Sequence, residues 1–277
     1  MKADCHLHMV LDGVDWKTSI ARGVDDGFIR AVLGRYRELG YTYLRDGGDR
    51  WGVGAKASAL APEYGITYRT PLSPLCKKGC YGSFIGTTWG DLREYAALVE
   101  MQKKAGADFV KIMISGLMDF DRFGVLTQPG LPAHEIRELI AIAQDAGMAV
   151  MAHCNGAETA LAAADAGVDS VEHGAYLNRD ALAAMADNRC IWVPTVSTVG
   201  NLLGKGRFDE GAVAAILENL LGNIAAFAAM GGMVAAGSDA GAWAVPHGCH
   251  TEEGWLKKAG LTDAAIAAGN RAIAERF

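Results

Sequence analysis

The regular alternation of short apolar runs with helix-like stretches is the feature that most constrains how this chain can fold. Apolar runs typical of buried strands fall at 3–9, 41–46, 66–72, 108–115, 149–154, 169–174, 190–197 and 233–239. Helical patterns follow many of them, at 91–107, 131–147, 156–167, 178–188, 209–231 and 262–275. Strands that alternate with helices predict βα units and a parallel sheet.

A closed sheet accounts for the pattern better than an open one. Residues of the kind that bind metals recur near the ends of the first, fourth, fifth, sixth and eighth predicted strands. An open, doubly wound sheet would spread these ends over roughly 25 Å or more, at about 4.8 Å per strand. Closing the sheet brings them to one rim. We therefore predict a single domain over residues 1–277, an α/β fold of the (β/α)8 TIM-barrel type without a small β-sandwich subdomain.

Composition excludes several classes of partner. The net charge is −6 and no cluster of lysines and arginines stands out, so nucleic acid is not expected. We expect no apolar run that approaches the roughly 20 residues of a membrane span, and the first residues lack the order of a signal peptide. The six cysteines form no tight framework, which favours free thiols in the cytoplasm. A small-molecule substrate is the expected partner.

Two histidines, His6 and His8, lie on the first predicted strand. Because a strand sends alternate side chains to opposite faces, both imidazoles point the same way. At the mouth of a barrel that direction is inward, where two nitrogens can bind one Zn²⁺ at about 2.0–2.1 Å. An apolar strand rarely carries two histidines without a role, so the pair favours a metal site over buried structural histidines.

Lys111 lies within the run VKIMI, among residues that favour burial. A buried lysine needs a partner, a lowered pKa or a chemical modification. Three interpretations stay open. Its stem could pack while the ammonium reaches solvent, it could be a Schiff-base lysine activated by desolvation, or it could be carboxylated by CO2 so that the carbamate bridges two metal ions.

His153 and His173 end neighbouring predicted strands, and Asp239 ends the last one, after VAAGS. Each histidine alone is more typical of a hydrogen-bonded core residue, but together they could bind a second ion. Asp239 stands in apolar surroundings that disfavour an ionised carboxylate. A bound cation is the simplest way to keep it charged there.

Taken in order, these residues resemble the amidohydrolase superfamily. The matching segments are DCHLH, FVKIMISG, MAHCNG, VEHG and GSDAG, and the resemblance is closest to the imidazolonepropionase and Xaa-Pro-dipeptidase-like branch. It extends over about residues 3–275. It implies a metal-dependent hydrolase of amide, peptide or cyclic C–N bonds, with two divalent ions, usually zinc. The implied ligands are His6, His8 and Asp239 for the first ion, and His153 and His173 for the second.

The resemblance also implies two catalytic residues, Lys111 and Asp239. A CO2-derived carbamate on Lys111 and a hydroxide would bridge the two ions. The hydroxide would attack the substrate carbonyl, while Asp239 accepts its proton and returns it to the leaving nitrogen. Members of the superfamily often carry a small β-sandwich, for which this sequence offers no residues. A partner subunit could then cover the barrel ends, so a homo-oligomer is one expectation.

Substrate contacts are suggested by two further residues. Tyr176, three residues past His173, would reach over the metals, and Arg122 lies on the long loop 115–130, where its guanidinium could clamp a carboxylate. Glu172 precedes His173, so strand alternation predicts that it points outward to the helices.

Other activities remain open on the same barrel. A mononuclear deaminase would need a proton-shuttling glutamate, and Glu158 lies inside the following predicted helix, which disfavours it. A lactonase or other esterase would use the same hydroxide. A Lys111 Schiff-base aldolase leaves the histidines unexplained, and a non-catalytic metal-binding barrel leaves an intact ligand set without a use.

Overall fold

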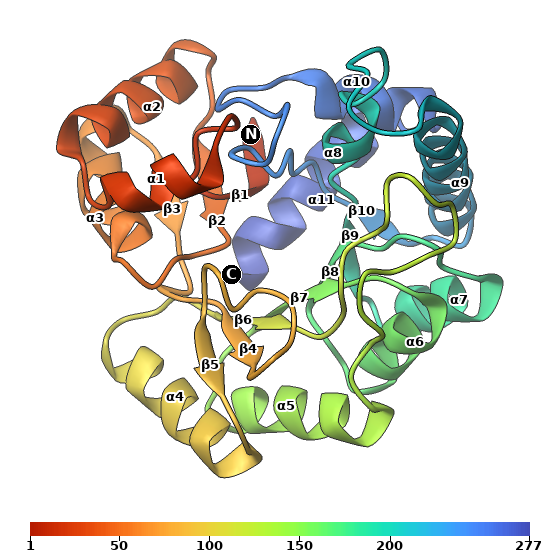
Figure 1. The fold of residues 1–277 in the computed structure, drawn as a ribbon, viewed down its shortest axis with the longest axis horizontal. Coiled ribbons are helices and arrows are strands. Elements are labelled where there is room, and N and C mark those ends of the chain that lie inside the picture. The colour runs from red at the N-terminus through yellow and green to blue at the C-terminus, as the bar shows by residue number, and fades with distance from the viewer.

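Helices surround a central ring of strands in the computed structural model, which describes residues 1–277 (Figure 1). The strands are β1 (Ala3–Leu7), β2 (Tyr43–Asp46), β3 (Thr67–Arg69), β4 (Leu75–Lys77), β5 (Thr87–Trp89), β6 (Val110–Met113), β7 (Val150–Cys154), β8 (Ser170–His173), β9 (Ile191–Val193) and β10 (Met233–Val234). The first helices are α1 (Trp16–Arg22), α2 (Asp26–Glu38), α3 (Val53–Leu60), the 3-10 turn η1 (Ala61–Tyr64), α4 (Leu92–Lys104) and α5 (Ala133–Asp145). The remaining helices are α6 (Ala157–Asp165), α7 (Arg179–Asp187), α8 (Ser197–Gly200), α9 (Glu210–Ala229), α10 (Thr251–Lys258) and α11 (Asp263–Arg276).

All paired strands run parallel, as the alternating pattern predicts. One sheet has the order β1-β2-β3 and the other the order β10-β9-β8-β7-β6-β4-β5. Backbone hydrogen bonds bridge both gaps between the two sheets. The amide of Asp239, just after β10, donates to the carbonyl of His6 in β1 at 2.7 Å, and the amide of Asp108 donates to the carbonyl of Thr70 at 3.0 Å. The expected α/β fold of the TIM-barrel type is confirmed.

Two short strands were not predicted. β4 and β5 lie between the third and fourth predicted strands, and β4 takes the place beside β6 that the third strand would occupy. Pro71 and Pro74 separate β3 from β4. Proline has no backbone amide hydrogen to donate to a neighbouring strand. The predicted third strand is therefore divided in two: β3 pairs with β2, and β4 pairs with β6.

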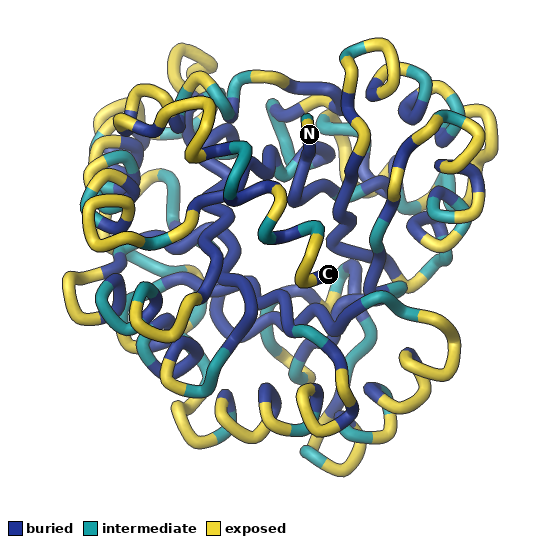
Figure 2. The backbone as a smooth tube through the Cα atoms, turned by 180° about the vertical axis from the view of Figure 1, so that it is seen from behind, coloured by how far each residue is buried: buried dark blue, intermediate teal, exposed yellow.

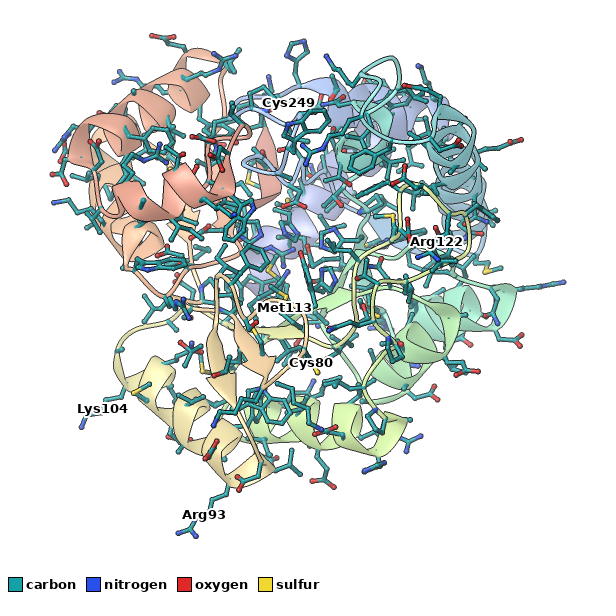
Figure 3. The ribbon with its side chains drawn as sticks, in the orientation of Figure 1. Cys80, Arg93, Lys104, Met113, Arg122 and Cys249 are labelled. Atoms are coloured by element: carbon teal, nitrogen blue, oxygen red, sulfur yellow. The ribbon has the colours of Figure 1, made fainter.

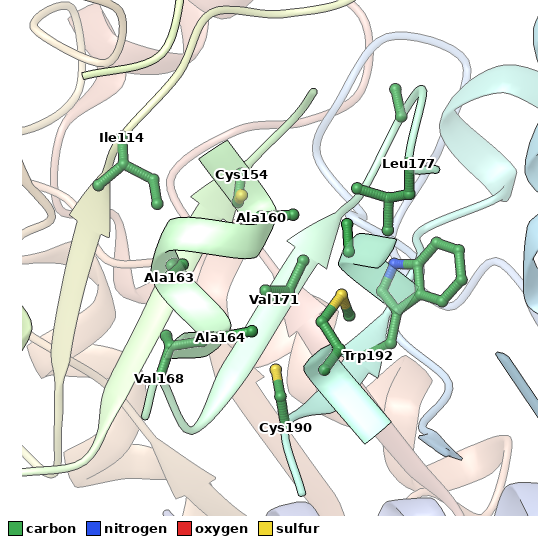
Figure 4. Close-up of a cluster of buried hydrophobic side chains, with 14 of the residues drawn as sticks. Ile114, Cys154, Ala160, Ala163, Ala164, Val168, Val171, Leu177, Cys190 and Trp192 are labelled. Atoms are coloured by element: carbon green, nitrogen blue, oxygen red, sulfur yellow. The ribbon is translucent and has the colours of Figure 1, made fainter. Parts of the chain in front are cut away.

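Alanine-rich helices bring the outer layer close to the strands. Figure 4 shows Ala160, Ala163 and Ala164 of α6 against Val171 of β8 and Cys154 of β7. All five side chains are buried, with exposed fractions of 0%. Small side chains allow a close approach of helix to sheet, and this packing keeps β7 and β8 rigid where they carry candidate site residues.

The last helix closes the rear of the ring. In Figure 2, which views the molecule from behind, the C-terminal end of α11 lies at the centre of the ring of strands. Ile273 and Phe277 pack with Phe109, Met151 and other strand side chains in a cluster of ten buried residues. This cluster fills the barrel interior at the end opposite the long loops.

One helix differs from what composition led us to expect. α9 is long and apolar enough to cross a membrane by length and composition alone, with a mean hydropathy of 1.6 over its most apolar window, of which 39% is buried. The expectation that no apolar run approaches that length was wrong. Val213, Ile216, Leu220 and Phe227 of α9 pack in the main hydrophobic core, as expected of a core helix.

Candidate active site

The predicted ligands from β1, from the residue that follows it and from the segment after β10 meet at one end of the barrel. His6 Nε2 and His8 Nε2 each lie 3.6 Å from Asp239 Oδ1. One ligand atom from each of these three side chains lies within 4.8 Å of the others. Both imidazoles of the H-x-H pair therefore face the same carboxylate, as strand alternation predicts.

The predicted ligands from β7 and β8 extend the same cluster. The rings of His153 and His173 lie 4.5 Å apart, and the rings of His173 and His6 lie 5.0 Å apart, measured between centroids. His173 Nδ1 also lies 4.0 Å from Asp239 Oδ2. The structure thus brings together side chains from β1, β7, β8 and the segment after β10.

Lys111 of β6 lies in the same interior and is completely buried. Its Nζ atom has no hydrogen-bond partner. Burial lowers the pKa of Lys111, while the charge of Glu172 opposes that shift. The side chain therefore does not reach solvent through its stem, which removes one of the three interpretations of this lysine.

Left-handed backbone positions the last two ligands. His173 and Asp239 have φ angles of 68° and 57°, in a region that non-glycine residues rarely adopt. His173 is the last residue of β8 and Asp239 lies in the segment that follows β10, and the left-handed conformation changes the backbone direction where both side chains line the pocket. Strain of this kind persists only when surrounding contacts hold it, and it often accompanies functional sites.

Glu172 corrects a prediction. It points into the barrel rather than outward to the helices, and its Oε2 atom lies 2.7 Å from His6 Nδ1. Val171, its neighbour, packs outward in the main core. Alternation therefore holds from Ser170 to Glu172, and the left-handed turn at His173 lets two consecutive residues reach the interior. Sequence alternation alone could not show that the last residue of β8, His173, adopts a left-handed conformation.

The other two histidines have neutral hydrogen-bond partners. His173 Nδ1 lies 2.7 Å from the hydroxyl of Thr195, and His153 Nε2 lies 3.1 Å from the carbonyl oxygen of Gly116. The side-chain amide of Asn155 also donates to that carbonyl, at 3.0 Å. Such contacts leave the second ring nitrogen of each histidine free for another ligand.

The donor set fits divalent metal ions. Burial lowers the pKa of His8 and of His153 to about 3, and it lowers the pKa of His6 and of His173 well below the usual value for histidine, so all four rings are neutral near pH 7. Neutral imidazole is the form that binds metal. His6 Nε2 is buried without a hydrogen-bond partner, which is unusual for a polar atom unless something else binds it.

These side chains form the base of a pocket of about 800 Å³. His8, Lys111, His153, His173 and Asp239 all line it. The volume suits a small molecule. A smaller pocket of about 210 Å³ adjoins it and shares His173 and Asp239, with mostly apolar walls.

Residues from loops and from the start of α1, which sequence reasoning missed, form the rim. Four are aromatic: Trp16, Tyr81, Phe84 and Trp243. The ring of Tyr81 lies 4.6 Å from that of His153, and the ring of Trp16 lies 5.5 Å from that of Phe84. Only clusters of aromatic residues in the long loops could have hinted at them, and no periodic pattern marks them.

The rim also carries charge. Arg207 lines both pockets, with its guanidinium carbon 4.2 Å from the centre of the Trp243 ring. Lys17 lies over Trp16 in the same way, at 5.7 Å. Neither cation forms an ion pair. The rim acid Asp15, by contrast, caps α1 by accepting from the amide of Lys17 at 2.9 Å.

The two predicted substrate contacts lie elsewhere. Arg122 is exposed and pairs with Asp119 on its own loop, and Figure 3 labels it far from Met113, which lines the pocket. Tyr176 is half-buried, and its ring packs against Phe123 with 5.4 Å between centroids. Neither residue lines the pocket, and Arg207 is the arginine that does.

Several solved structures share this fold. The chain is similar to a Xaa-Pro dipeptidase with bound methionine, at a TM-score of 0.80 and 21% identity, covering 99% of this chain and 75% of that one. It is similar to the ochratoxinase of A. niger, with a TM-score of 0.77 and 18% identity, and the match covers 98% of this chain and 68% of that one. It is also similar to a prolidase in complex with N-methylphosphonate-L-proline, with a TM-score of 0.72 and 20% identity. That match covers 99% of this chain and 71% of the prolidase. Identities this low establish the fold alone.

Sequence comparison supplies the family. None of the curated protein sequences matches the chain significantly. The model of the amidohydrolase family matches residues 75–245, which is more than half of the chain and includes Lys111, His153, His173 and Asp239. The chain therefore belongs to the amidohydrolase family, and it is a hydrolase that acts on carbon–nitrogen bonds.

Proposed function

We propose that this protein is a metal-dependent hydrolase of small amide or peptide substrates, with a binuclear zinc centre. The observation that carries the proposal is the convergence of neutral histidines, a buried lysine and a carboxylate at the base of a pocket of about 800 Å³. The convergence includes buried nitrogens that have no protein partner, on His6 and Lys111.

The ligands fall into two groups. His6, His8 and Asp239 would hold one ion, and His153 and His173 would hold the other. When bound, such ions supply Lewis acidity, which lowers the pKa of water and polarises a carbonyl group. Lys111 lines the same pocket, and burial lowers its pKa, so its neutral amine is accessible near neutral pH. That amine can add to CO2, forming an N–C bond and releasing one proton, and the resulting carbamate would supply oxygen ligands to both ions.

Asp239 is the residue we assign to proton transfer. Its carboxylate faces the pocket, and burial raises its pKa from the value of an exposed aspartate. A carboxylate of this kind can accept a proton from water and pass it to a leaving nitrogen. The left-handed backbone at Asp239 fixes the direction of its side chain and so limits the proton's path.

The rim favours small substrates with an apolar group and a carboxylate. Aromatic side chains supply apolar contact area, and the unpaired cations Lys17 and Arg207 suit an anionic group. Dipeptides and N-acyl amino acids have both features. The Xaa-Pro dipeptidase and the prolidase among the similar structures support the same substrate class. We further propose a cytoplasmic enzyme that acts as a single domain, with homo-oligomerisation left to be measured.

The deaminase alternative loses support. Glu158, the glutamate nearest to His153 along the chain, is exposed in the first turn of α6. A proton shuttle must lie within hydrogen-bond reach of the substrate, and an exposed residue on the outer helix does not.

Metal content of the purified protein tests the proposal directly. Mass spectrometry after incubation with zinc and bicarbonate should find close to two ions per chain, and fewer in a Lys111→Ala variant. Hydrolysis of a panel of dipeptides and N-acyl amino acids should follow the metal content. One ion per chain regardless of Lys111 would replace the binuclear centre with a mononuclear one, and none would refute metal dependence.

A further inference from the structure

We infer that a buried chain of contacts from Phe277 through Arg45 and Glu172 holds His6 in the orientation and tautomer that a metal ion requires. This inference rests on the proposed function, because it assigns positioning roles to residues behind a proposed ligand. None of these three residues lines the pocket. Their effect on the reaction would therefore be exerted through His6.

Glu172 fixes the proton on His6. Its carboxylate can only accept hydrogen bonds when ionised, so the 2.7 Å contact requires His6 Nδ1 to carry the hydrogen. The lone pair is then on His6 Nε2, the atom that faces Asp239 and has no hydrogen-bond partner. A flipped ring would place a carbon atom against the carboxylate and lose the contact. Outer-shell carboxylates of this kind orient metal-bound histidines and raise their basicity.

Arg45 holds the Glu172 carboxylate in place. Its NH2 atom donates to Glu172 Oε1 at 2.8 Å, and Ser170 Oγ donates to the same oxygen at 2.6 Å. The other guanidinium nitrogens are also used, by the carbonyl of Cys5 at 2.7 Å and by Ser170 Oγ at 3.0 Å. Arg45 and Glu172 are both completely buried, so each charge depends on the other.

The contact chain extends to the last helix. The guanidinium carbon of Arg45 lies 4.4 Å from the centre of the Phe277 ring, and Phe277 packs edge-to-face on Phe109 at 5.2 Å. Aromatic rings on one side and fixed acceptors on the other leave Arg45 a single arrangement. α11 thus supports the ligand cluster from the rear of the barrel, on the far side from the pocket.

The test uses Glu172→Gln and, as its matched control, Glu252→Gln. Glu252 is also a buried carboxylate, but it accepts from the amides of Val196 and Ser197 and contacts no proposed ligand. Nitrogen NMR of ¹⁵N-histidine-labelled, metal-free protein reports the tautomer of His6. Competition with a chromophoric chelator reports the affinity for zinc.

We expect the wild type and Glu252→Gln to show His6 with its hydrogen on Nδ1. Glu172→Gln should give mixed tautomers, because an amide can both donate and accept, and should bind zinc about 10- to 100-fold more weakly. An unchanged tautomer together with unchanged zinc affinity in Glu172→Gln would overturn the inference.

A double variant protects the test against misfolding. Arg45→Met combined with Glu172→Gln removes both buried charges and keeps the side-chain volumes similar. It should show the same loss of the His6 tautomer, and a folded double variant with wild-type tautomer and affinity would again refute the inference. If the wild type binds no zinc but the tautomer still depends on Glu172, the metal proposal fails while the positioning of His6 stands.

A smaller change probes the far end of the chain of contacts. Phe277→Leu keeps an apolar side chain but removes the ring beneath Arg45. Zinc affinity should fall by about threefold, less than for Glu172→Gln, because Arg45 keeps all its hydrogen bonds. An unchanged affinity for zinc would show that Phe277 is not part of the chain of contacts, which would then begin at Arg45.

Discussion

The base and the rim of the pocket are built from different parts of the chain. The base consists of side chains on strands or directly after them, and His6, Lys111 and His153 are at most 2% exposed. The rim consists of residues from loops and from the start of α1, such as Arg207, Trp16 and Lys17, which are exposed. Strands fixed by helices on the outside give precise geometry, whereas loops give surfaces that can vary. The comparison shows that the residues proposed for catalysis and those proposed for substrate selection lie on different elements of the fold.

The two regions also differ in solvation. Low polarity at the base lowers the pKa of the histidines and keeps them neutral for metal binding. Water reaches the rim, where the cations remain charged and are screened by salt. Substitutions at the base should therefore affect the rate of the chemical step, and those at the rim should affect substrate binding.

The largest effect is expected from Asp239→Asn at the base. Loss of its proton transfer and of one ligand atom should lower kcat about a thousandfold, equivalent to about 4 kcal/mol. Steady-state kinetics on the best substrate of the panel would measure it. Asp15→Asn at the rim is the matched control and should stay within about threefold, because asparagine also caps helices. Equal losses in both variants would erase the distinction between the two regions.

The next largest effect concerns the free energy of unfolding and its dependence on pH, through a histidine that supports the rim. His247 is buried behind the rim, with Nε2 2.8 Å from the carbonyl of Leu11, and burial lowers its pKa to about 4. Its contribution to stability is present above pH 6.5, the value in the unfolded chain, and is lost as pH falls toward 4, because only the unfolded state takes up the proton. At pH 5 the loss amounts to about 2 kcal/mol.

A comparison of variants isolates that contribution. Urea unfolding of metal-free wild type and His247→Gln at pH 7.5 and pH 5 would give the difference in unfolding free energy. The wild type should lose about 2 kcal/mol relative to the variant between these values. If the unfolding free energies of the wild type and the variant changed equally between the two pH values, His247 would titrate as in the unfolded chain.

Arg207→Met is expected to have a moderate effect. For substrates with a carboxylate, KM should rise about tenfold, or about 1.4 kcal/mol, with kcat within about threefold. Arg122→Met is the matched control, since Arg122 is exposed and paired with Asp119, and its KM should change less than twofold. The reverse result would restore Arg122 as the carboxylate contact and would show that the loop 115–130 rearranges on binding.

The smallest effect is expected from Tyr176→Phe. Its hydroxyl has no hydrogen-bond partner and its ring packs on Phe123, so both kcat and KM should stay within about twofold. A tenfold fall in kcat would instead place the hydroxyl near the reacting carbonyl in the complex, as the sequence suggested.

Much of the base could be predicted because its signals are local. His6 and His8 share a face through strand alternation, and Lys111 and His153 lie on apolar runs that form strands. Glu172 could not be placed, since its direction depends on the left-handed turn at His173. The division of the third predicted strand into β3 and β4 was missed because the segment between them is short and contains prolines.

The sequence by itself determined the alternation of strands with helices, the parallel sheet and the ligand types near the strand ends. These features follow from periodicity and position, which neighbouring residues set. Only the tertiary structure decided that Arg45 and Glu172 support His6, and that Arg207 rather than Arg122 borders the pocket. Those contacts join residues far apart in the chain, and their geometry is fixed by packing around the closed barrel rather than by local preference.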